Sequence, residues 1–306
     1  MKNDLKSPAQ RPPAVDTHAH VFSRELELAQ ERRYAPAYDA TLDDFLGQLN
    51  ANAIGNAVLV QPSFLGADNS YLLQALAQEP IRLKGVAVLS TDVSDETLLS
   101  LNDQGVVGVR LNLVGQPPSM RLGDQSALWK RLAELGWHVE LHRESTYLAA
   151  LMAPLLRAGV RVVVDHFGRP DPRLGVRDPG FKSLLDFADS ERVWMKLSAA
   201  YRCVVPGAFA SAHAFASDAT EQLLSRFGTD HLMWGSDWPH TQFERAVNYG
   251  DTLATFEELD LDRASVDAIL RTTPNAFYGF EPTDGRQGHG HEEQVTVSHH
   301  SRQRPT

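Results

Sequence analysis

Residues 138–166, HVELHRESTYLAALMAPLLRAGVRVVVDH, contain the repeating unit that decides the fold. The runs from His138 to His142 and from Arg161 to His166 are short and contain Val and Leu, as expected of strands. Between them, Thr146 to Arg157 has apolar residues at helical spacing. Gly159 follows, where a left-handed residue commonly ends a helix. A strand, a helix and a second strand in this order predict two parallel strands joined by a helical crossover.

The same unit recurs on both sides of this stretch. The candidate strands are Val15 to His20, Ala57 to Gln61, Gly85 to Leu89, Val106 to Leu113, His138 to His142, Arg161 to His166, Val193 to Ser198 and Leu232 to Asp237. The helix-like stretches between them include Thr41 to Asn50, Asn69 to Gln78, Gln125 to Leu135, Thr146 to Arg157 and Ala208 to Phe227. This alternation predicts an α/β fold, the (β/α)8 TIM barrel.

One domain is expected to hold nearly the whole chain. With 306 residues, of which 42% are hydrophobic and 22% charged, the chain is long enough for one large core. No linker interrupts the alternation, so the barrel is expected to span residues 14–280. Residues 1–13 are expected to form a flexible N-terminus. Residues 281–306, rich in His, Gly and Gln, are expected to form a disordered tail.

Composition excludes several classes of function. The net charge of -10 argues against nucleic-acid binding, which needs clustered positive charge. A single cysteine, Cys203, excludes an intrachain disulfide and a thiolate metal site. No apolar run is long enough to cross a membrane and no secretory signal is evident, so the cytoplasm is the expected compartment. A small molecule is the expected partner of the chain. The sequence does not decide whether the chain forms a homo-oligomer.

Histidines and an aspartate lie where the predicted strands end. His18 and His20 are two residues apart on one strand, so their side chains point to the same face. His142, His166 and Asp237 each close another strand. Barrel enzymes build their sites from the carboxyl ends of different strands. Singly, each histidine could be a core residue and Asp237 a helix cap. Together they predict one active site.

This set of groups suits hydrolysis. Imidazoles and a carboxylate bind divalent ions such as zinc, which lower the pKa of bound water and polarise a carbonyl. A carboxylate near that water can accept its proton, and an imidazole can hold the substrate oxygen as negative charge develops. Asp237 is the expected base and His166 the expected carbonyl partner. His240, in the loop after the last strand, is expected to line the substrate pocket.

Several motifs resemble those of the amidohydrolase-related family (amidohydrolase 2). They are DTHAHVF at 16–22, RYAP at 33–36, GVRLN at 108–112, DHFGRPD at 165–171, WGSDWPH at 234–240 and TPNAFY at 273–278. The resemblance runs from about Val15 to Phe280. It is most marked to the branch that contains 2-pyrone-4,6-dicarboxylate lactonase and sugar lactonases.

The resemblance implies a barrel hydrolase that opens a cyclic ester (lactone) of a carboxylated or sugar-derived substrate. Asp237 would activate water, with His18, His20 and His166 around the scissile carbonyl. Four residues match positions that contact substrate in the pyrone dicarboxylate enzyme: Arg110, Arg202, Tyr34 and Ser63. Guanidinium groups suit this role because they bind carboxylates through paired hydrogen bonds.

The chain departs from that enzyme at two places. His142 replaces a tyrosine on the fifth strand, and residues 113–116, LVGQ, lack a further arginine. The same substrate is therefore not implied. The dicarboxylate lactonase works without a metal, whereas metal-dependent relatives carry a histidine on the fifth strand. His18, His20, His142 and Asp237 are therefore the predicted ligands of a divalent metal, zinc by preference, and the metal-free mechanism is the alternative.

Two other functions compete with lactone hydrolysis. Metal-dependent relatives include decarboxylases of unsaturated carboxylic acids, which would release carbon dioxide rather than a proton. A non-catalytic barrel that binds a ligand is the second alternative. Such a module has no need of a carboxylate placed to take a proton from water.

Overall fold

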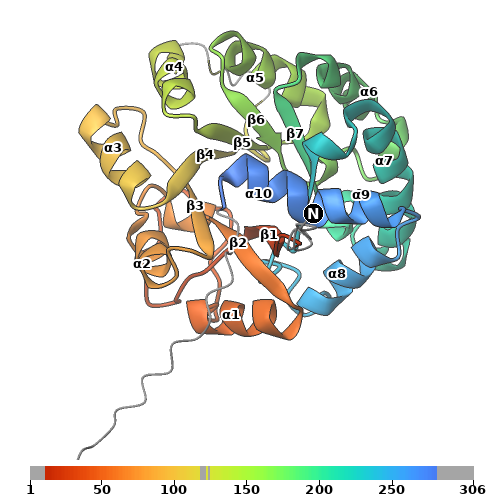
Figure 1. Cartoon of the computed structure of the whole chain (residues 1–306), viewed down its shortest axis with the longest axis horizontal. Coiled ribbons are helices and arrows are strands. Elements are labelled where there is room, and N and C mark those ends of the chain that lie inside the picture. Colours follow the sequence, from red (N-terminus) through yellow and green to blue (C-terminus); the bar gives the residue numbers. More distant parts are fainter. Residues whose placement is uncertain (1–10, 118–121, 123–124, 281–306) are drawn as a thin grey trace, which may run out of the picture.

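The computed structural model describes residues 11–117, 122 and 125–280 (Figure 1). Eight parallel strands follow one another around a barrel in chain order. They are β1 Ala14–Ala19, β2 Ile54–Val60, β3 Leu83–Ala87, β4 Val106–Asn112, β5 His138–His142, β6 Arg161–Val164, β7 Val193–Ser198 and β8 Leu232–Gly235. The predicted (β/α)8 TIM barrel is confirmed. The expected tail at 281–306 and most of the expected flexible N-terminus lie outside the described residues.

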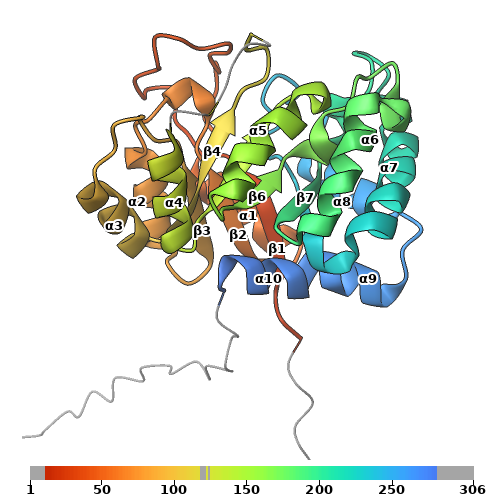
Figure 2. The ribbon, with the colours of Figure 1, turned by 90° about the horizontal axis from the view of Figure 1, so that it is seen from above.

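Helices surround the barrel and cover one of its ends. They are α1 Leu42–Ala51, α2 Ser70–Gln78, α3 Asp95–Asp103, α4 Ser126–Glu134, α5 Ser145–Arg157, α6 Pro179–Leu185, α7 Ala212–Phe227, α8 Tyr249–Glu257, α9 Arg263–Asp267 and α10 Thr273–Tyr278. Figure 2 shows α10 across the end of the barrel where the strands begin. The loops that follow the strands lie at the other end of the barrel, where the strands finish. None of the described helices is both long and apolar enough to cross a membrane.

A buried carboxylate joins the first strand to the last. Asp16 Oδ1 accepts hydrogen bonds from the backbone amides of Ser236, at 2.9 Å, and His18, at 3.1 Å. Its Oδ2 accepts from Ser236 Oγ at 2.6 Å and from Tyr249 at 3.1 Å. The backbone amide of Asp237 in turn donates to the carbonyl of His18 at 2.8 Å. Barrel closure therefore fixes the segment that carries Asp237 against β1.

Candidate active site

The two histidines of the first strand lie together at the carboxyl end of the barrel. His18 belongs to β1, and His20 follows the last residue of that strand. Both side chains are buried, and their ring centroids are 5.0 Å apart. His20 Nδ1 lies 2.7 Å from the carbonyl oxygen of Val60 and donates to it, since a carbonyl can only accept.

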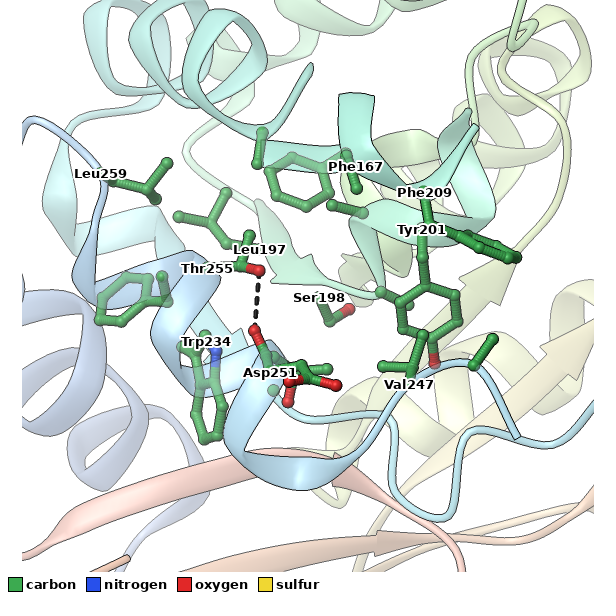
Figure 3. A pocket seen from close by; sticks show the side chains of 18 residues that line it. Phe167, Leu197, Ser198, Tyr201, Phe209, Trp234, Val247, Asp251, Thr255 and Leu259 are labelled. Atoms are coloured by element: carbon green, nitrogen blue, oxygen red, sulfur yellow. Dashed lines mark hydrogen bonds between the residues drawn. The ribbon is translucent and has the colours of Figure 1, made fainter. Parts of the chain in front are cut away.

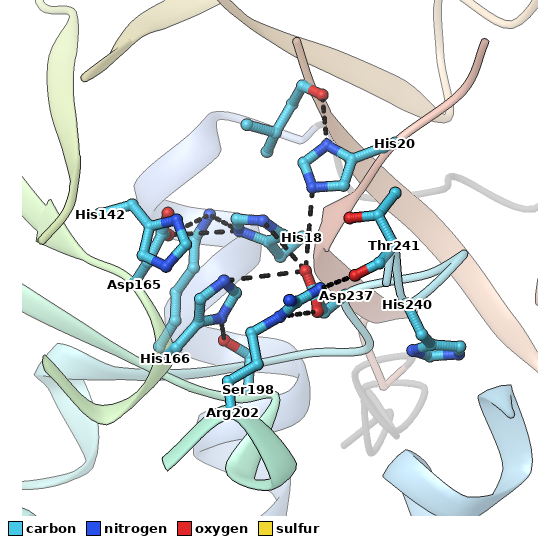
Figure 4. A network of polar contacts seen from close by, with 12 residues as sticks. His18, His20, His142, Asp165, His166, Ser198, Arg202, Asp237, His240 and Thr241 are labelled. Atoms are coloured by element: carbon cyan, nitrogen blue, oxygen red, sulfur yellow. Dashed lines mark hydrogen bonds and ion pairs between the residues drawn. The ribbon is translucent and has the colours of Figure 1, made fainter. Parts of the chain in front are cut away.

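Three imidazoles converge on one oxygen of Asp237 (Figure 4). Asp237 Oδ1 lies 3.7 Å from His18 Nε2, 3.8 Å from His20 Nε2 and 3.7 Å from His166 Nε2. These distances exceed those of hydrogen bonds. Neither His18 Nε2 nor His166 Nε2 has a hydrogen-bond partner among the described residues, although both are buried. The four atoms therefore face a common region that a small oxygen atom of water or substrate can enter.

The other oxygen of Asp237 is held by two donors. Arg202 Nε donates to Asp237 Oδ2 at 2.7 Å, and the Tyr201 hydroxyl donates to the same oxygen. Arg202 also donates through Nη2 to the carbonyl of Thr241 at 3.1 Å. The carboxylate is thereby fixed in orientation, with Oδ1 turned toward the histidines.

Burial and charge set the protonation states of these groups. Burial lowers the pKa of His20 to about 4 and those of His18 and His166 well below the ordinary value. Burial raises the pKa of Asp237, but the Arg202 guanidinium and the three imidazoles together outweigh burial and hold that pKa well below its usual range. At neutral pH the site therefore holds neutral imidazoles around an ionised carboxylate.

The backbone is strained at the residues that carry this chemistry. His166, Asp237 and His240 have φ angles of 52°, 63° and 61°, in the left-handed region that residues with a side chain rarely adopt. Such conformations persist where the surroundings impose them, and they cluster at functional sites. They also end the strand ladders early. β6 and β8 stop at Val164 and Gly235, two residues before the predicted ends at His166 and Asp237.

A cavity of about 250 Å³ opens over this cluster and is rich in arginine. Arg33, Arg110, Arg169 and Arg202 all line it. Arg202 pairs with Asp237, and Arg110 lies 3.5 Å from Asp165 Oδ2. Arg33 donates instead to the neutral Asn112 side chain at 2.7 Å, and Arg169 Nη1 lies 3.5 Å from His142 Nε2. Within the described part of the chain, neither Arg33 nor Arg169 forms an ion pair with a carboxylate. The cavity therefore offers two guanidinium groups to an anion.

Four of the five predicted substrate contacts line the cavity. Tyr34 and Ser63 line the cavity, as do Arg110 and Arg202. His240 is not among the lining residues. Its Nδ1 lies 3.2 Å from the Tyr201 hydroxyl, and the ring is buried behind Asp237. His240 therefore does not line this cavity, and its contact with substrate stays a prediction.

The predicted metal ligands do not assemble as one set of four. His142 lies between two guanidinium groups, with Nδ1 3.3 Å from Arg110 Nη2 and Nε2 3.5 Å from Arg169 Nη1. Guanidinium is a donor only and a neutral imidazole has one lone pair, so one of the two arginines competes with a metal for that lone pair while the other faces the ring N–H. His142 therefore stands as an acceptor between two arginines and not beside His18, His20 and Asp237.

A different group has the composition of a metal site. The donor atoms of His18, His166 and Asp237 lie within 4.8 Å of one another and are all buried. Imidazole nitrogen and carboxylate oxygen are suitable ligands for a divalent ion. The surroundings fit an ion less well, because His18 Nδ1 lies 3.1 Å from the Lys196 ammonium. Ligating histidines almost always donate their second nitrogen to an acceptor.

Sequence reasoning did not assign roles to several residues of the site. Arg33 and Arg169 lie within the quoted motifs RYAP and DHFGRPD, in the loops that follow β1 and β6, and that position could have suggested anion contacts. Lys196 is a charged residue within the buried strand VWMKLS, which is a detectable signal. Nothing in the local sequence indicates that Ser198 Oγ lies 2.8 Å from His166 Nδ1.

A second cavity, of about 210 Å³, lies beside the site (Figure 3). Its lining is mostly apolar and comes from β7, β8, α7 and α8 together with nearby loops. Ser198 and Tyr201 line this cavity while their hydroxyl groups bond to His166 and Asp237. It lacks the cluster of imidazoles and guanidiniums, so the chemistry is assigned to the arginine-rich cavity.

Comparisons with known proteins agree with this geometry. The model of the Amidohydrolase family matches residues 15–280. The chain is 34% identical to a 2-pyrone-4,6-dicarboxylate hydrolase of Comamonas testosteroni, over 78% of this chain and 80% of that protein. It is 32% identical to a 4-sulfomuconolactone hydrolase of Rhizobium radiobacter, over 87% of this chain and 90% of that protein.

A solved structure with a bound acid is also similar. It comes from Acinetobacter baumannii, is provisionally assigned as a 2-pyrone-4,6-dicarboxylic acid hydrolase and holds citric acid. It shares 37% sequence identity and a TM-score of 0.82, covering 88% of this chain and 100% of that one.

Proposed function

The chain belongs to the amidohydrolase family, and we propose that it hydrolyses a small lactone that carries at least one further acidic group. The observation that carries this proposal is a single cavity lined by Asp237, His20, His166 and four arginines, with the buried His18 Nε2 3.7 Å from Asp237 Oδ1. The lactone hydrolases among its relatives support the same reaction.

In the proposed reaction Asp237 is the base. Its Oδ1 takes a proton from a water molecule while the resulting oxygen attacks the lactone carbonyl. His166 and His18 present Nε2 atoms that can stabilise the carbonyl oxygen as it gains negative charge. Asp237 then returns its proton to the ring oxygen that leaves. The products are a new carboxylic acid and an alcohol or enol, so each turnover releases one proton near neutral pH.

The arginines decide the class of substrate. Arg33 and Arg169 line the cavity without a carboxylate partner among the described residues. A guanidinium group without a partner in a half-enclosed space binds carboxylate or sulfonate strongly, because it offers paired donors. The similar Acinetobacter protein holds citric acid, which has three carboxyl groups. We therefore favour a substrate with one or two acidic groups.

Arg169→Met is expected to raise KM for an acidic lactone about tenfold to a hundredfold, with kcat changed less. The lost contact is made equally to substrate and to transition state. Arg173→Met is the matched control, since Arg173 is exposed nearby and does not line this cavity. Steady-state kinetics measures both. An unchanged KM for Arg169→Met would place the acidic group of the substrate elsewhere.

Proton release tests the reaction itself. A panel of lactones with and without carboxylate or sulfonate groups is mixed with the enzyme in weak buffer and followed with a pH indicator. We expect acidification with acidic lactones and little with neutral ones. Carbon dioxide release from unsaturated acids, without acidification by any lactone, would instead favour the decarboxylase alternative.

Zinc remains a prediction for this site. If bound, the ion would lower the pKa of water and polarise the carbonyl. The reaction proposed above uses no step through an ion, because His142 and His18 both have ring nitrogens that face cations. Elemental analysis of protein purified without chelator measures metal directly. One equivalent of zinc, with activity lost on chelation, would favour the metal-dependent mechanism.

A further inference from the structure

A lysine lies buried in the barrel directly beneath the active site. Lys196, on β7, has no exposed surface. Its ammonium group donates to Glu140 Oε2 on β5, lies 3.7 Å from Asp165 Oδ1 and contacts His18 Nδ1 at 3.1 Å. Neighbouring carboxylates thus offset the buried cation, and its remaining hydrogens can reach the imidazole.

The contact with Lys196 determines which nitrogen of His18 carries the proton. An ammonium group has donors and no lone pair, so His18 Nδ1 must accept from it. Two carboxylate oxygens also lie near Nδ1, Asp165 Oδ1 at 3.2 Å and Glu140 Oε1 at 3.4 Å. Neither of these two contacts has hydrogen-bond geometry, whereas the contact with Lys196 does, so we take Lys196 as the partner of Nδ1. A neutral His18 then carries its hydrogen on Nε2.

His20 has the opposite arrangement. Its Nδ1 donates to the carbonyl of Val60, which leaves a lone pair on Nε2. Both Nε2 atoms face Asp237 Oδ1 at nearly equal distances, 3.7 Å for His18 and 3.8 Å for His20. The reaction centre therefore has one imidazole donor and one imidazole acceptor next to the carboxylate.

We propose that Lys196 is a positioning residue that holds His18 in its Nε2–H form, so that His18 donates a hydrogen bond to the substrate oxygen and does not ligate a metal. The donor role rests on the proposed hydrolysis. The tautomer and the exclusion of metal rest on the Lys196 contact alone. A metal ligand needs the Nε2 lone pair, which the proton occupies.

The surroundings keep Lys196 a donor. Burial and the neighbouring Asp165 raise the pKa of Glu140 to about 8, so Glu140 can hold a proton near neutral pH. Burial also raises the pKa of Asp165, but Lys196, His166 and Arg110 together outweigh burial and the net pKa of Asp165 is lowered. Asp165 therefore stays ionised beside the lysine, whichever form Glu140 takes.

The tautomer can be measured directly on the unmodified protein. Long-range nitrogen–proton NMR correlations of the His18 ring, assigned by their loss in His18→Gln, are expected to show the proton on Nε2 and a lone pair on Nδ1. This experiment needs neither substrate nor a Lys196 variant. A proton on Nδ1 of His18 in the wild-type protein would overturn the proposal.

Zinc binding provides the second test. Lys196→Met combined with Glu140→Gln removes the donor and its nearest carboxylate together. His18 Nδ1 can then donate to Asp165, which frees Nε2. We expect zinc chloride to bind the chelator-treated double variant about tenfold to a hundredfold more tightly than the wild type, by calorimetry. Glu140→Gln alone keeps the lysine and is the matched control, with zinc affinity as in the wild type.

Two results would contradict the exclusion of metal. One is tight stoichiometric zinc binding by the wild-type protein that is lost in His18→Gln. The other is a folded double variant whose His18 tautomer and zinc affinity equal those of Glu140→Gln. Because neither readout involves a lactone, failure of the proposed hydrolysis would leave this test intact, and the reverse also holds.

Discussion

Asp237→Asn is expected to lower kcat/KM for an acidic lactone by about 10³-fold or more. Asparagine keeps the shape of the side chain but cannot take a proton from water, and general base catalysis contributes up to about 10⁴-fold. The amide keeps one oxygen, which can still accept from Arg202 and Tyr201, so the side chain can stay in place. Proton release in weak buffer, with single-turnover kinetics, measures the loss.

The matched control for Asp237→Asn is Asp171→Asn. Asp171 is exposed in the loop after β6 and does not line the arginine-rich cavity, so its loss should leave kcat/KM within about twofold. Activity of Asp237→Asn within tenfold of the wild type would show that another group activates the water.

Arg202→Met is expected to lower kcat/KM about a hundredfold and to change its pH dependence. Removing one member of a buried ion pair costs about 2–5 kcal/mol, largely because the other charge is left unpaired. In the wild type, the pKa of Asp237 lies well below its ordinary value of 3.8, because Arg202 acts together with the three imidazoles against burial. Without Arg202, burial is opposed by the imidazoles only, and that pKa rises.

The sign of the pH effect follows from the role of Asp237 as a base. Activity needs the ionised carboxylate and is lost as the pH falls through its pKa. In the wild type the acid limb is expected near pH 4, where His20 becomes protonated. In Arg202→Met the limb should move to higher pH. Arg202→Lys keeps a cation and is expected to hold the limb near the wild-type position. Identical pH profiles for all three proteins would contradict the ion pair as the cause.

The main features of the fold could be predicted from the sequence because they depend on local pattern. Buried parallel strands need short apolar runs, and crossover helices need an apolar stripe. The strand at His138–His142 has the predicted bounds. The strands before His166 and Asp237 end two residues earlier than predicted, because those residues adopt left-handed backbone that breaks the ladder.

Local sequence pattern does not determine whether His142 can bind a metal. His142 has the right residue type at the right strand end, yet Arg110 and Arg169 contact its two nitrogens. Whether a histidine can bind an ion depends on what its second nitrogen meets. Those neighbours come from other strands and loops and leave no mark near His142 in the sequence.

By itself, the sequence determined the barrel fold and the location of the site at the carboxyl ends of the strands. It also determined the main chemical groups there, which are Asp237, His18, His20 and His166. These follow from periodicity, which is local, and from parallel strands ending at one edge. Only the tertiary structure decided their partners. Arg202 binds Asp237, two arginines have no carboxylate partner among the described residues, and Lys196 contacts His18 across 178 residues of chain. Hydrogen-bond direction and pKa depend on such neighbours, and folding alone brings them together.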